Sequence, residues 1–386
     1  METHSVDVLY QIFVMFAAAK LLDAAGRKAH VPAVISEIVA GILIGPSLLN
    51  LVQIQEWTLA LAQLGAIVLL FSVGLSQKLS DLLAVGGTAL RVAVLGVVAP
   101  FFLGWGLMVA LGYNQTESVF LGAAMVATSV GISARVLDEL GALRTVVATV
   151  ILAAAVIDDI LGIIVLALAG TLTLGVGYVE VVSIAALAVG FTLFVVLVGH
   201  RVAPLINRYV AGETAFALAM VLCLGLSLAA AKARIAAIIG AFLAGLFFSE
   251  EELSGGVKDK VHALHEFLVP FFFVAMGMQM NLSVLGRGSL LLLAALVTAL
   301  AVVGKLIGCG LGAYSLGRAQ ALQVGVGMVP RGEVGLIVAS IGLGLSAISE
   351  EVYAVVIIMV LVTTLAAPPA LRMLLAKQET PPLGDP

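Results

Sequence analysis

Long apolar segments are the feature of this sequence that most restricts its fold. One runs from about Val146 to Leu172 and exceeds the roughly 20 residues that a helix needs to cross a bilayer. Hydrophobic residues make up 62% of the chain and charged residues only 11%, against about 25% charged in ordinary domains. Because helices satisfy their own backbone hydrogen bonds in lipid, we expect residues 1–386 to form one all-α polytopic membrane protein. The net charge of −4 gives no indication of nucleic-acid binding.

Thirteen segments are apolar enough to be membrane spans, although several are interrupted by glycine or proline. Their approximate ranges are 6–25, 31–49, 58–75, 87–111, 117–140, 146–172, 179–199, 213–230, 235–249, 263–279, 289–314, 319–344 and 351–374. The first segment lacks the basic region of a cleavable signal peptide, so we expect it to be retained as a helix.

Lysine and arginine residues are unevenly shared between the two sides of these spans. If the N-terminus lies outside, the inner loops and tail hold Arg27, Lys28, Lys78, Arg91, Arg135, Arg144, Arg201, Arg208, Lys258, Lys260, Arg318, Arg372 and Lys377. The outer loops then hold only Lys232, Arg234 and Arg287. Because positively charged loops stay in the cytoplasm, we expect a bacterial inner-membrane protein with its N-terminus outside and its C-terminus in the cytoplasm.

Two adjacent acids, Asp158 and Asp159, lie near the middle of the sixth segment. A charge at the centre of a spanning helix costs roughly 2.5–3.5 kcal/mol. The acids are therefore either functional or a structural pair that is held neutral or bridged by a cation. Successive helical residues differ by about 100° around the axis, so both acids cannot face one partner. We expect one to pair with a fixed cation and the other to face a water-filled cavity.

A lysine in the eleventh segment is the expected fixed cation. Lys305 lies within the apolar run Val302–Gly308, too deep for its ammonium group to reach water easily. Its simplest role is an ion pair with one of the two aspartates.

Hydroxyl residues surround a glycine in the middle of the fifth segment, at Thr128, Ser129 and Gly131. Glycine weakens a helix, and serine or threonine can satisfy backbone groups that leave the helical ladder. These residues indicate a broken helix that lines a cavity. The alternative is an intact helix whose hydroxyls bond to the preceding turn.

A second break is predicted in the twelfth segment, at Pro330 and Gly332. Proline removes a backbone donor and clashes with the preceding turn. Two opposite charges, Arg331 and Glu333, flank this break. They either compensate each other across the break or contact a bound ion directly.

The two breaks fall in the fifth and twelfth of thirteen spans. Six spans, one linker span and six further spans form two halves of opposite orientation. Interrupted segments at corresponding positions of two halves are typical of inverted-repeat transporters, whose site lies at the bilayer midplane. We expect two crossed discontinuous helices, an expectation that rests on segment order because the halves share no evident sequence identity.

Three further ionisable residues allow two interpretations each. Glu37 in the second segment forms either a hydrogen bond between helices or part of a functional site. His262 and His265, at the start of the tenth segment, either sense cytoplasmic pH or belong to an interfacial polar face.

Together these motifs resemble those of the bacterial monovalent cation:proton antiporters, in particular the NapA-type sodium/proton antiporters. The resemblance covers essentially all thirteen spans and is carried by Glu37–Pro46, Thr128–Leu137, Ile157–Asp159, Lys305 and Met328–Leu336. It implies a homodimer whose two subunits meet through their scaffold domains. Each scaffold domain is formed by residues of about 6–75 and 179–279. It also implies a mobile core domain at about 87–172 and 289–374.

The same resemblance implies the roles of the site residues. Asp159 is the main carrier of Na+ and of protons, Asp158 pairs with Lys305, and Thr128 and Ser129 line the site. Sodium is a hard cation that prefers oxygen ligands, which carboxylate, hydroxyl, freed backbone carbonyl groups and water can supply.

We therefore expect an antiporter that exchanges cytoplasmic Na+ (or Li+) for external protons by alternating access within membrane lipid. We expect no cofactor and no enzymatic activity. More than one proton per sodium ion would make the exchange electrogenic. Potassium-efflux relatives usually lack the double aspartate, which favours sodium as the substrate.

Four alternatives remain beside this expectation. They are a potassium/proton exchanger of the same architecture, a sodium-coupled organic-solute symporter, a passive channel and an intramembrane aspartyl protease. The protease needs two aspartates on separate helices, whereas Asp158 and Asp159 are adjacent on one.

Overall fold

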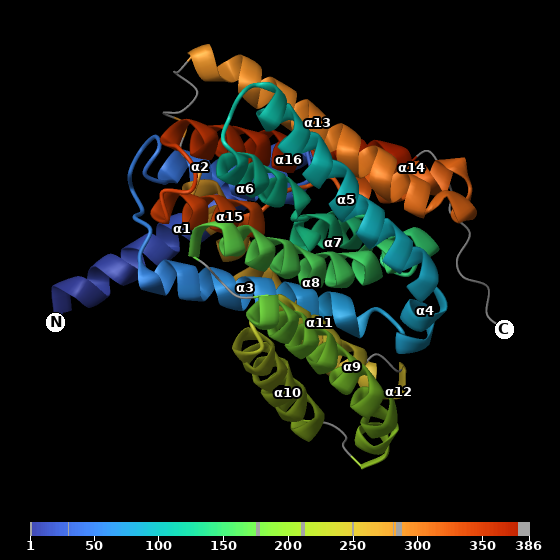
Figure 1. Ribbon diagram of the computed structural model, residues 1–386. Coiled ribbons are helices and arrows are strands. Elements are labelled where there is room, and N and C mark those ends of the chain that lie inside the picture. Colours follow the sequence, from blue (N-terminus) through green and yellow to red (C-terminus); the bar gives the residue numbers. More distant parts are fainter. Residues whose placement is uncertain are drawn as a thin grey trace.

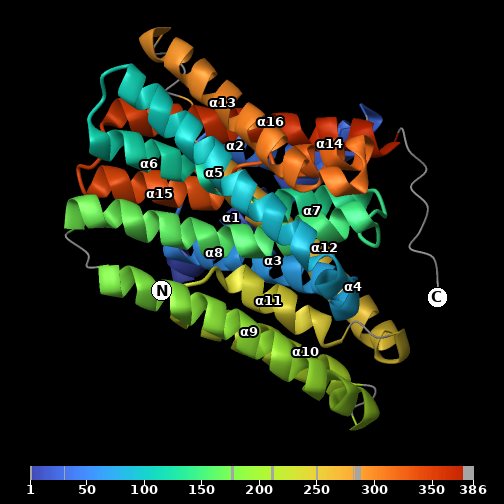
Figure 2. The same ribbon diagram turned by 45° about the vertical axis from the view of Figure 1, so that its right-hand side comes forward.

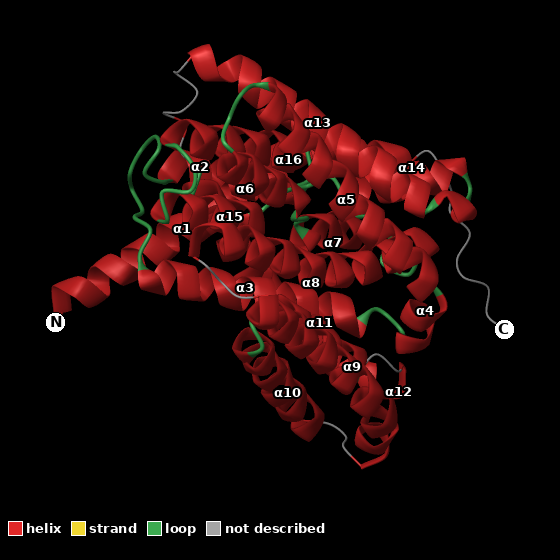
Figure 3. Ribbon diagram, viewed as in Figure 1, coloured by secondary structure: helices red, strands yellow, loops and turns green. Residues whose placement is uncertain are grey.

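The computed structural model describes residues 2–29, 31–174, 178–209, 213–248, 251–280, 282 and 288–376. Helices and loops make up this part of the chain (Figure 3). Arg287 and Lys377, two of the residues used to predict orientation, lie outside the described residues.

The described helices coincide with the apolar segments of the sequence. They are α1 (Glu2–Lys28), α2 (Ala33–Ile44), α3 (Glu56–Leu75), α4 (Leu79–Ala84), α5 (Gly86–Ala110), α6 (Gln115–Val126), α7 (Val130–Glu139), α8 (Val146–Leu174), α9 (Tyr178–Tyr209), α10 (Glu213–Lys232), α11 (Ala237–Leu246), α12 (Glu251–Met278), α13 (Gly288–Gly312), the short 3-10 helix η2 (Tyr314–Leu316), α14 (Arg318–Gly327), α15 (Glu333–Gly344) and α16 (Glu350–Ala376).

Ten helical stretches of the described part are long and apolar enough to cross a membrane, and one of them contains both α6 and α7. Three shorter apolar helices, α2, α11 and α15, accompany them. The all-α membrane fold is therefore confirmed, while the number of thirteen spans stays a prediction.

The helices fall into two groups by their packing. Helices α5, α6, α8, α13, α14, α15 and α16 pack mainly against one another, and α1, α2, α3, α11 and α12 form a second group, with α10 against α11. Helix α7 contacts α3 of one group and α8 and α16 of the other, and α9 contacts α8 and α11, so these two helices connect the groups. In both views α13 and α5 lie at the opposite side of the molecule from α9 and α10 (Figures 1 and 2). The division into a core domain and a scaffold domain stays a prediction.

Glycines let α2 and α12 approach closely at the level of the backbone. A Cβ atom on Gly41 would collide with the carbonyl oxygen of Val274, and one on Gly277 would collide with that of Ile38. Close contact between small residues replaces hydrophobic driving force where helices associate in lipid. The second group of helices is therefore held together by backbone proximity as well as by apolar side chains.

Candidate cation site

Two helical spans are broken near their centres, and the breaks cross. Between α6 and α7, and between α14 and α15, the chain is extended for a few residues. The Ser129 N–H donates to the Pro330 carbonyl at 2.8 Å, and Thr128 Oγ1 donates to the Met328 carbonyl at 3.4 Å. Helices α6 and α15 lie at one end of the molecule and α7 and α14 at the other (Figures 1 and 2). The two predicted discontinuous helices are therefore present, and an intact fifth helix is excluded.

Small residues bring the two breaks together. Pro330 has no N–H group to leave unsatisfied, and its carbonyl is the one that Ser129 binds. A Cβ atom on Gly332 would lie 2.5 Å from Ser129 Oγ, so only glycine fits beside this serine. Gly131, in the first turn of α7, packs against the ring of Phe272 from α12. Pro330 and Gly332 therefore allow the two breaks to touch.

The fully buried guanidinium group of Arg331 holds the end of the other broken helix. Its NH1 donates to the carbonyls of Val126 at 3.4 Å and Ala127 at 3.0 Å, and its NH2 donates to the Ala301 carbonyl at 3.3 Å. The last carbonyls of a helix have no intrahelical donor and carry partial negative charge. Arg331 supplies both a donor and a positive charge at the end of α6.

Glu333 is not the partner of this arginine. It is the first residue of α15, where a negative charge is favourable next to the positive end of the helix dipole. Its Oε2 lies 3.5 Å from Ser129 Oγ, which donates to it. Of the two interpretations of Arg331 and Glu333, mutual compensation is not seen among the described contacts, because each charge lies at the end of a different helix.

A buried ion pair joins the two groups that the sequence places deep in lipid. Lys305 Nζ of α13 lies 2.8 Å from Asp158 Oδ1 of α8, and both side chains are 0% exposed. The second oxygen of Asp158 has no hydrogen-bond partner among the described residues. Removing one partner of such a pair leaves an uncompensated buried charge, which costs about 3–5 kcal/mol. The geometry therefore couples the charge states of Lys305 and Asp158.

Asp159 has different surroundings from its neighbour. It lines a cavity of about 630 Å³ whose wall includes Phe120, Ala237 and Val334. It also lines a small void beside Val130, at the start of α7. Asp159 therefore lies near the beginnings of α7 and α15, where the positive ends of two helix dipoles favour negative charge. Of the two adjacent acids, it is the one that lines a cavity.

The cavity extends to one end of the molecule. Its wall includes Phe120 in the middle of α6, Gly170 near the end of α8, and Leu345 just after α15. Glu180 and Arg234, which are exposed and lie 3.9 Å apart, also line it. An ion can therefore reach Asp159 through this cavity from the end of the molecule at which α6 begins.

The opposite end is closed by contacts of Arg135 in α7. Its NH2 lies 3.7 Å from Glu37 Oε1 of α2, its Nε 3.2 Å from Glu139 Oε1, and its NH1 3.3 Å from His265 Nε2 of α12. Glu139 Oε2 also accepts from the Ala33 N–H at the start of α2. Three helices are therefore tied together where α7 ends.

These contacts correct one expectation. Arg135 was expected in an inner loop, but it lies within α7 and is only 8% exposed. Its spacing of four residues from Glu139 was the available signal, because such pairs meet on a helix surface. Glu37 contacts Arg135 of another helix as an ion pair at 3.7 Å. His265 is 2% exposed, whereas His262 is exposed. The two interpretations of Glu37 and those of the histidines stay predictions.

Comparisons with known proteins agree with this geometry. Residues 13–377 match the family described as "Sodium/hydrogen exchanger, transmembrane". The chain is 35% identical to the high-affinity Na+/H+ antiporter NhaS3 of Synechocystis sp., over 97% of this chain and 92% of that protein. It is 34% identical to the Na+/H+-K+ antiporter GerN of Bacillus cereus, over 95% and 96% respectively.

A solved structure shows the same fold. The sodium proton antiporter MjNhaP1 of Methanocaldococcus jannaschii superposes with a TM-score of 0.75 at 17% identity, covering 97% of this chain and 98% of that one.

Replacing Arg331 with glutamine should lower the melting temperature of the protein in detergent. A hydrogen bond from a charged donor contributes about 1.5–3 kcal/mol, and three carbonyls lose such a donor. Arg91→Gln, at an exposed position of α5, is the matched control and should melt close to the wild type. Equal melting temperatures for the two variants would show that the end of α6 does not depend on Arg331.

Proposed function

Because this chain belongs to the sodium/hydrogen exchanger family, we propose that it is an antiporter that exchanges cytoplasmic Na+ for external protons. The observation that carries the proposal is the unequal treatment of two adjacent acids. Asp158 is bound by Lys305, whereas Asp159 lines a cavity. A single accessible carboxylate at the centre of a membrane helix can hold either cation, but not both together.

Asp159 is the shared carrier in this mechanism. A proton that arrives at its carboxylate removes the negative charge that holds Na+, and Na+ that arrives displaces the proton. Sodium prefers oxygen ligands, which Asp159, water and backbone carbonyls freed at the two breaks supply. Thr128 and Ser129 support the site chiefly by holding the two breaks together, and their oxygens are further candidate ligands.

Access to Asp159 alternates between the two ends of the molecule. The cavity reaches Asp159 from the end at which α6 begins, which is the outside if the N-terminus is outside. Contacts of Arg135 with Glu37 and His265 close the cytoplasmic end. Opening that end requires α7 to separate from α2 and α12, which fits a core domain that moves against a scaffold domain. By its resemblance to the family we further propose a homodimer that meets through the scaffold.

The exchange is electrogenic in this proposal. When Na+ occupies Asp159, its positive charge weakens the hold of Asp158 on Lys305, because both acids lie on one turn of α8. A second proton then leaves from this pair. Each net charge that crosses the membrane couples the exchange to the potential by about 2.3 kcal/mol per 100 mV.

Potassium is the second candidate substrate. A relative that is 34% identical is named an Na+/H+-K+ antiporter, and Asp159 offers a carboxylate that either ion can bind. Competition between Na+, Li+ and K+ for proton release from the purified protein separates these substrates. A sodium-coupled organic-solute symporter would show no proton movement in the same assay.

Asp159→Asn should abolish the Na+-dependent dissipation of a pH gradient in proteoliposomes, because an amide can neither release a proton nor supply negative charge to Na+. Asp81→Asn, on the short helix α4, is the matched control and should retain exchange. Both variants should elute as folded protein. Robust exchange by folded Asp159→Asn would exclude Asp159 as the shared carrier.

Lys305→Gln should retain some exchange but lose its response to an imposed membrane potential, because the second proton no longer has its lysine partner. The double variant Asp158→Asn/Lys305→Gln removes both charges and should recover stability that the single variant loses, since no unpaired buried charge remains. The measurement compares the rate of exchange at zero membrane potential with the rate at a potential clamped to a fixed value. A voltage response equal to that of the wild type in both variants would reject the pair as the source of electrogenicity.

A further inference from the structure

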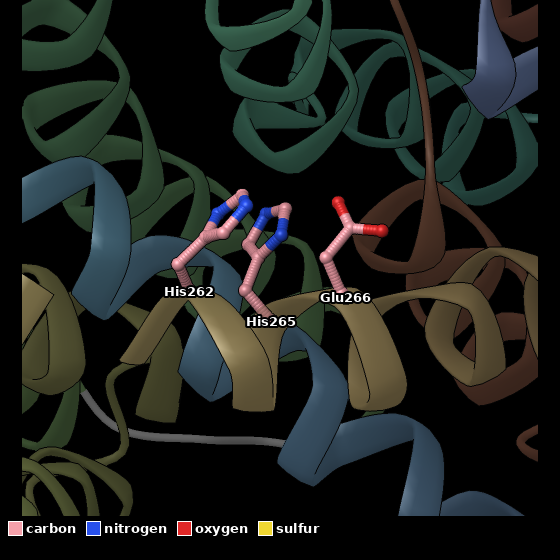
Figure 4. Close-up of side chains that lie close together, drawn as sticks. All are labelled: His262, His265 and Glu266. Atoms are coloured by element: carbon pink, nitrogen blue, oxygen red, sulfur yellow. The ribbon is translucent and has the colours of Figure 1, made fainter. Parts of the chain in front are cut away.

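Three metal-ligating side chains lie together on α12, apart from the aspartates. His265 and Glu266 follow His262 by three and four residues, spacings that place each of them on the same helix face as His262. Their ligand atoms all lie within 4.8 Å of one another. Figure 4 shows both imidazole rings and the carboxylate rising from the same side of α12. The two rings are nearly parallel, with an interplanar angle of 12° and centroids 6.2 Å apart.

The three side chains line a polar pocket of about 430 Å³ at the end of the molecule that Arg135 closes. Asp138 of α7 lines the same pocket, and its Oδ2 lies 3.8 Å from His265 Nε2. His262 and Glu266 are exposed, so a dissolved ion can reach them without opening the helices. A fourth oxygen ligand is thus available from the helix opposite α12.

The positive charges near these ligands are already paired. Arg135 NH1 lies 3.3 Å from His265 Nε2. The same guanidinium group lies within 4 Å of carboxylate oxygens of Glu139 and Glu37. Lys20 Nζ lies 3.4 Å from Glu266 Oε2. The lysine side chain is 33% exposed and the glutamate side chain 48%. Exposed pairs contribute up to about 1 kcal/mol, so a divalent ion can displace Lys20. The remaining charged residues of the pocket are Asp23, Arg27 and Arg372.

We propose that His262, His265 and Glu266 bind a divalent transition-metal ion such as Zn2+, with Asp138 as a ligand from α7. Two imidazoles with a carboxylate form a ligand set typical of Zn2+, whereas Mg2+ and Ca2+ prefer oxygen ligands alone. The ion joins α12 to α7, the helices that the contact between His265 and Arg135 already joins. A bound ion therefore holds the cytoplasmic end closed and inhibits exchange. The inhibition rests on the proposed function, whereas the binding does not.

Calorimetric titration of the purified protein with Zn2+ tests the site. The wild type and the control His200→Gln, in α9, should bind one ion per chain with the same affinity. His262→Gln and His262→Gln/Glu266→Gln should bind it more weakly by at least roughly tenfold, because loss of an outer-shell partner of a ligand already costs about 10–100-fold. Equal affinity in the wild type and in both variants would overturn the site.

Proteoliposomes test the inhibition. Zn2+ on the cytoplasmic side should slow exchange by the wild type without changing its apparent affinity for Na+, because the ion does not compete for Asp159. His262→Gln should exchange normally and resist Zn2+. If the wild type binds Zn2+ as above but keeps its full exchange rate, the proposed closure is overturned. If the wild type shows no exchange without Zn2+, the proposed antiport fails, and the titration still decides whether the site exists.

Discussion

A bilayer offers no water to a helix that is broken inside it, so the backbone groups freed at a break need partners from the protein. Here each break supplies partners to the other, and Thr364 of α16 donates to the Arg331 carbonyl. The Pro330 carbonyl receives the Ser129 N–H, and Arg331 donates to the carbonyls at the end of α6. Neither break satisfies its backbone groups alone, which explains why the two occur together. The crossing fixes the position of the helix starts beside Asp159.

Two adjacent aspartates acquire separate roles because one turn of α8 points them in different directions. Asp158 lies against Lys305 at 2.8 Å, away from solvent, and Asp159 lines the cavity. The buried pair keeps a positive charge at the membrane centre without a bound ion. Asp159 can then exchange its own ion beside that pair. This division is the physical basis of the proposed antiport.

Much of the fold follows from the sequence, because membrane spans are long apolar segments and because Pro330 and Gly131 mark the breaks locally. The sequence also indicates that Lys305 needs an acid, since no other role suits a lysine so deep in lipid. It does not reveal which segment crosses which. The sequence therefore left Arg331 either as the partner of Glu333 or in contact with a bound ion, whereas it binds the end of α6. Arg135 likewise looked like a loop residue, because its partners on α2 and α12 are distant in sequence.

The central claim is that Na+ and a proton exclude each other at Asp159. Binding of Na+ to the purified wild-type protein, measured by calorimetry from alkaline to acid pH, tests it most directly. If one proton competes with one Na+, the apparent affinity for Na+ falls by about tenfold for each unit by which the pH is lowered. This holds over the pH range in which Asp159 carries a proton. An affinity for Na+ that stays constant across the whole pH range would contradict the account.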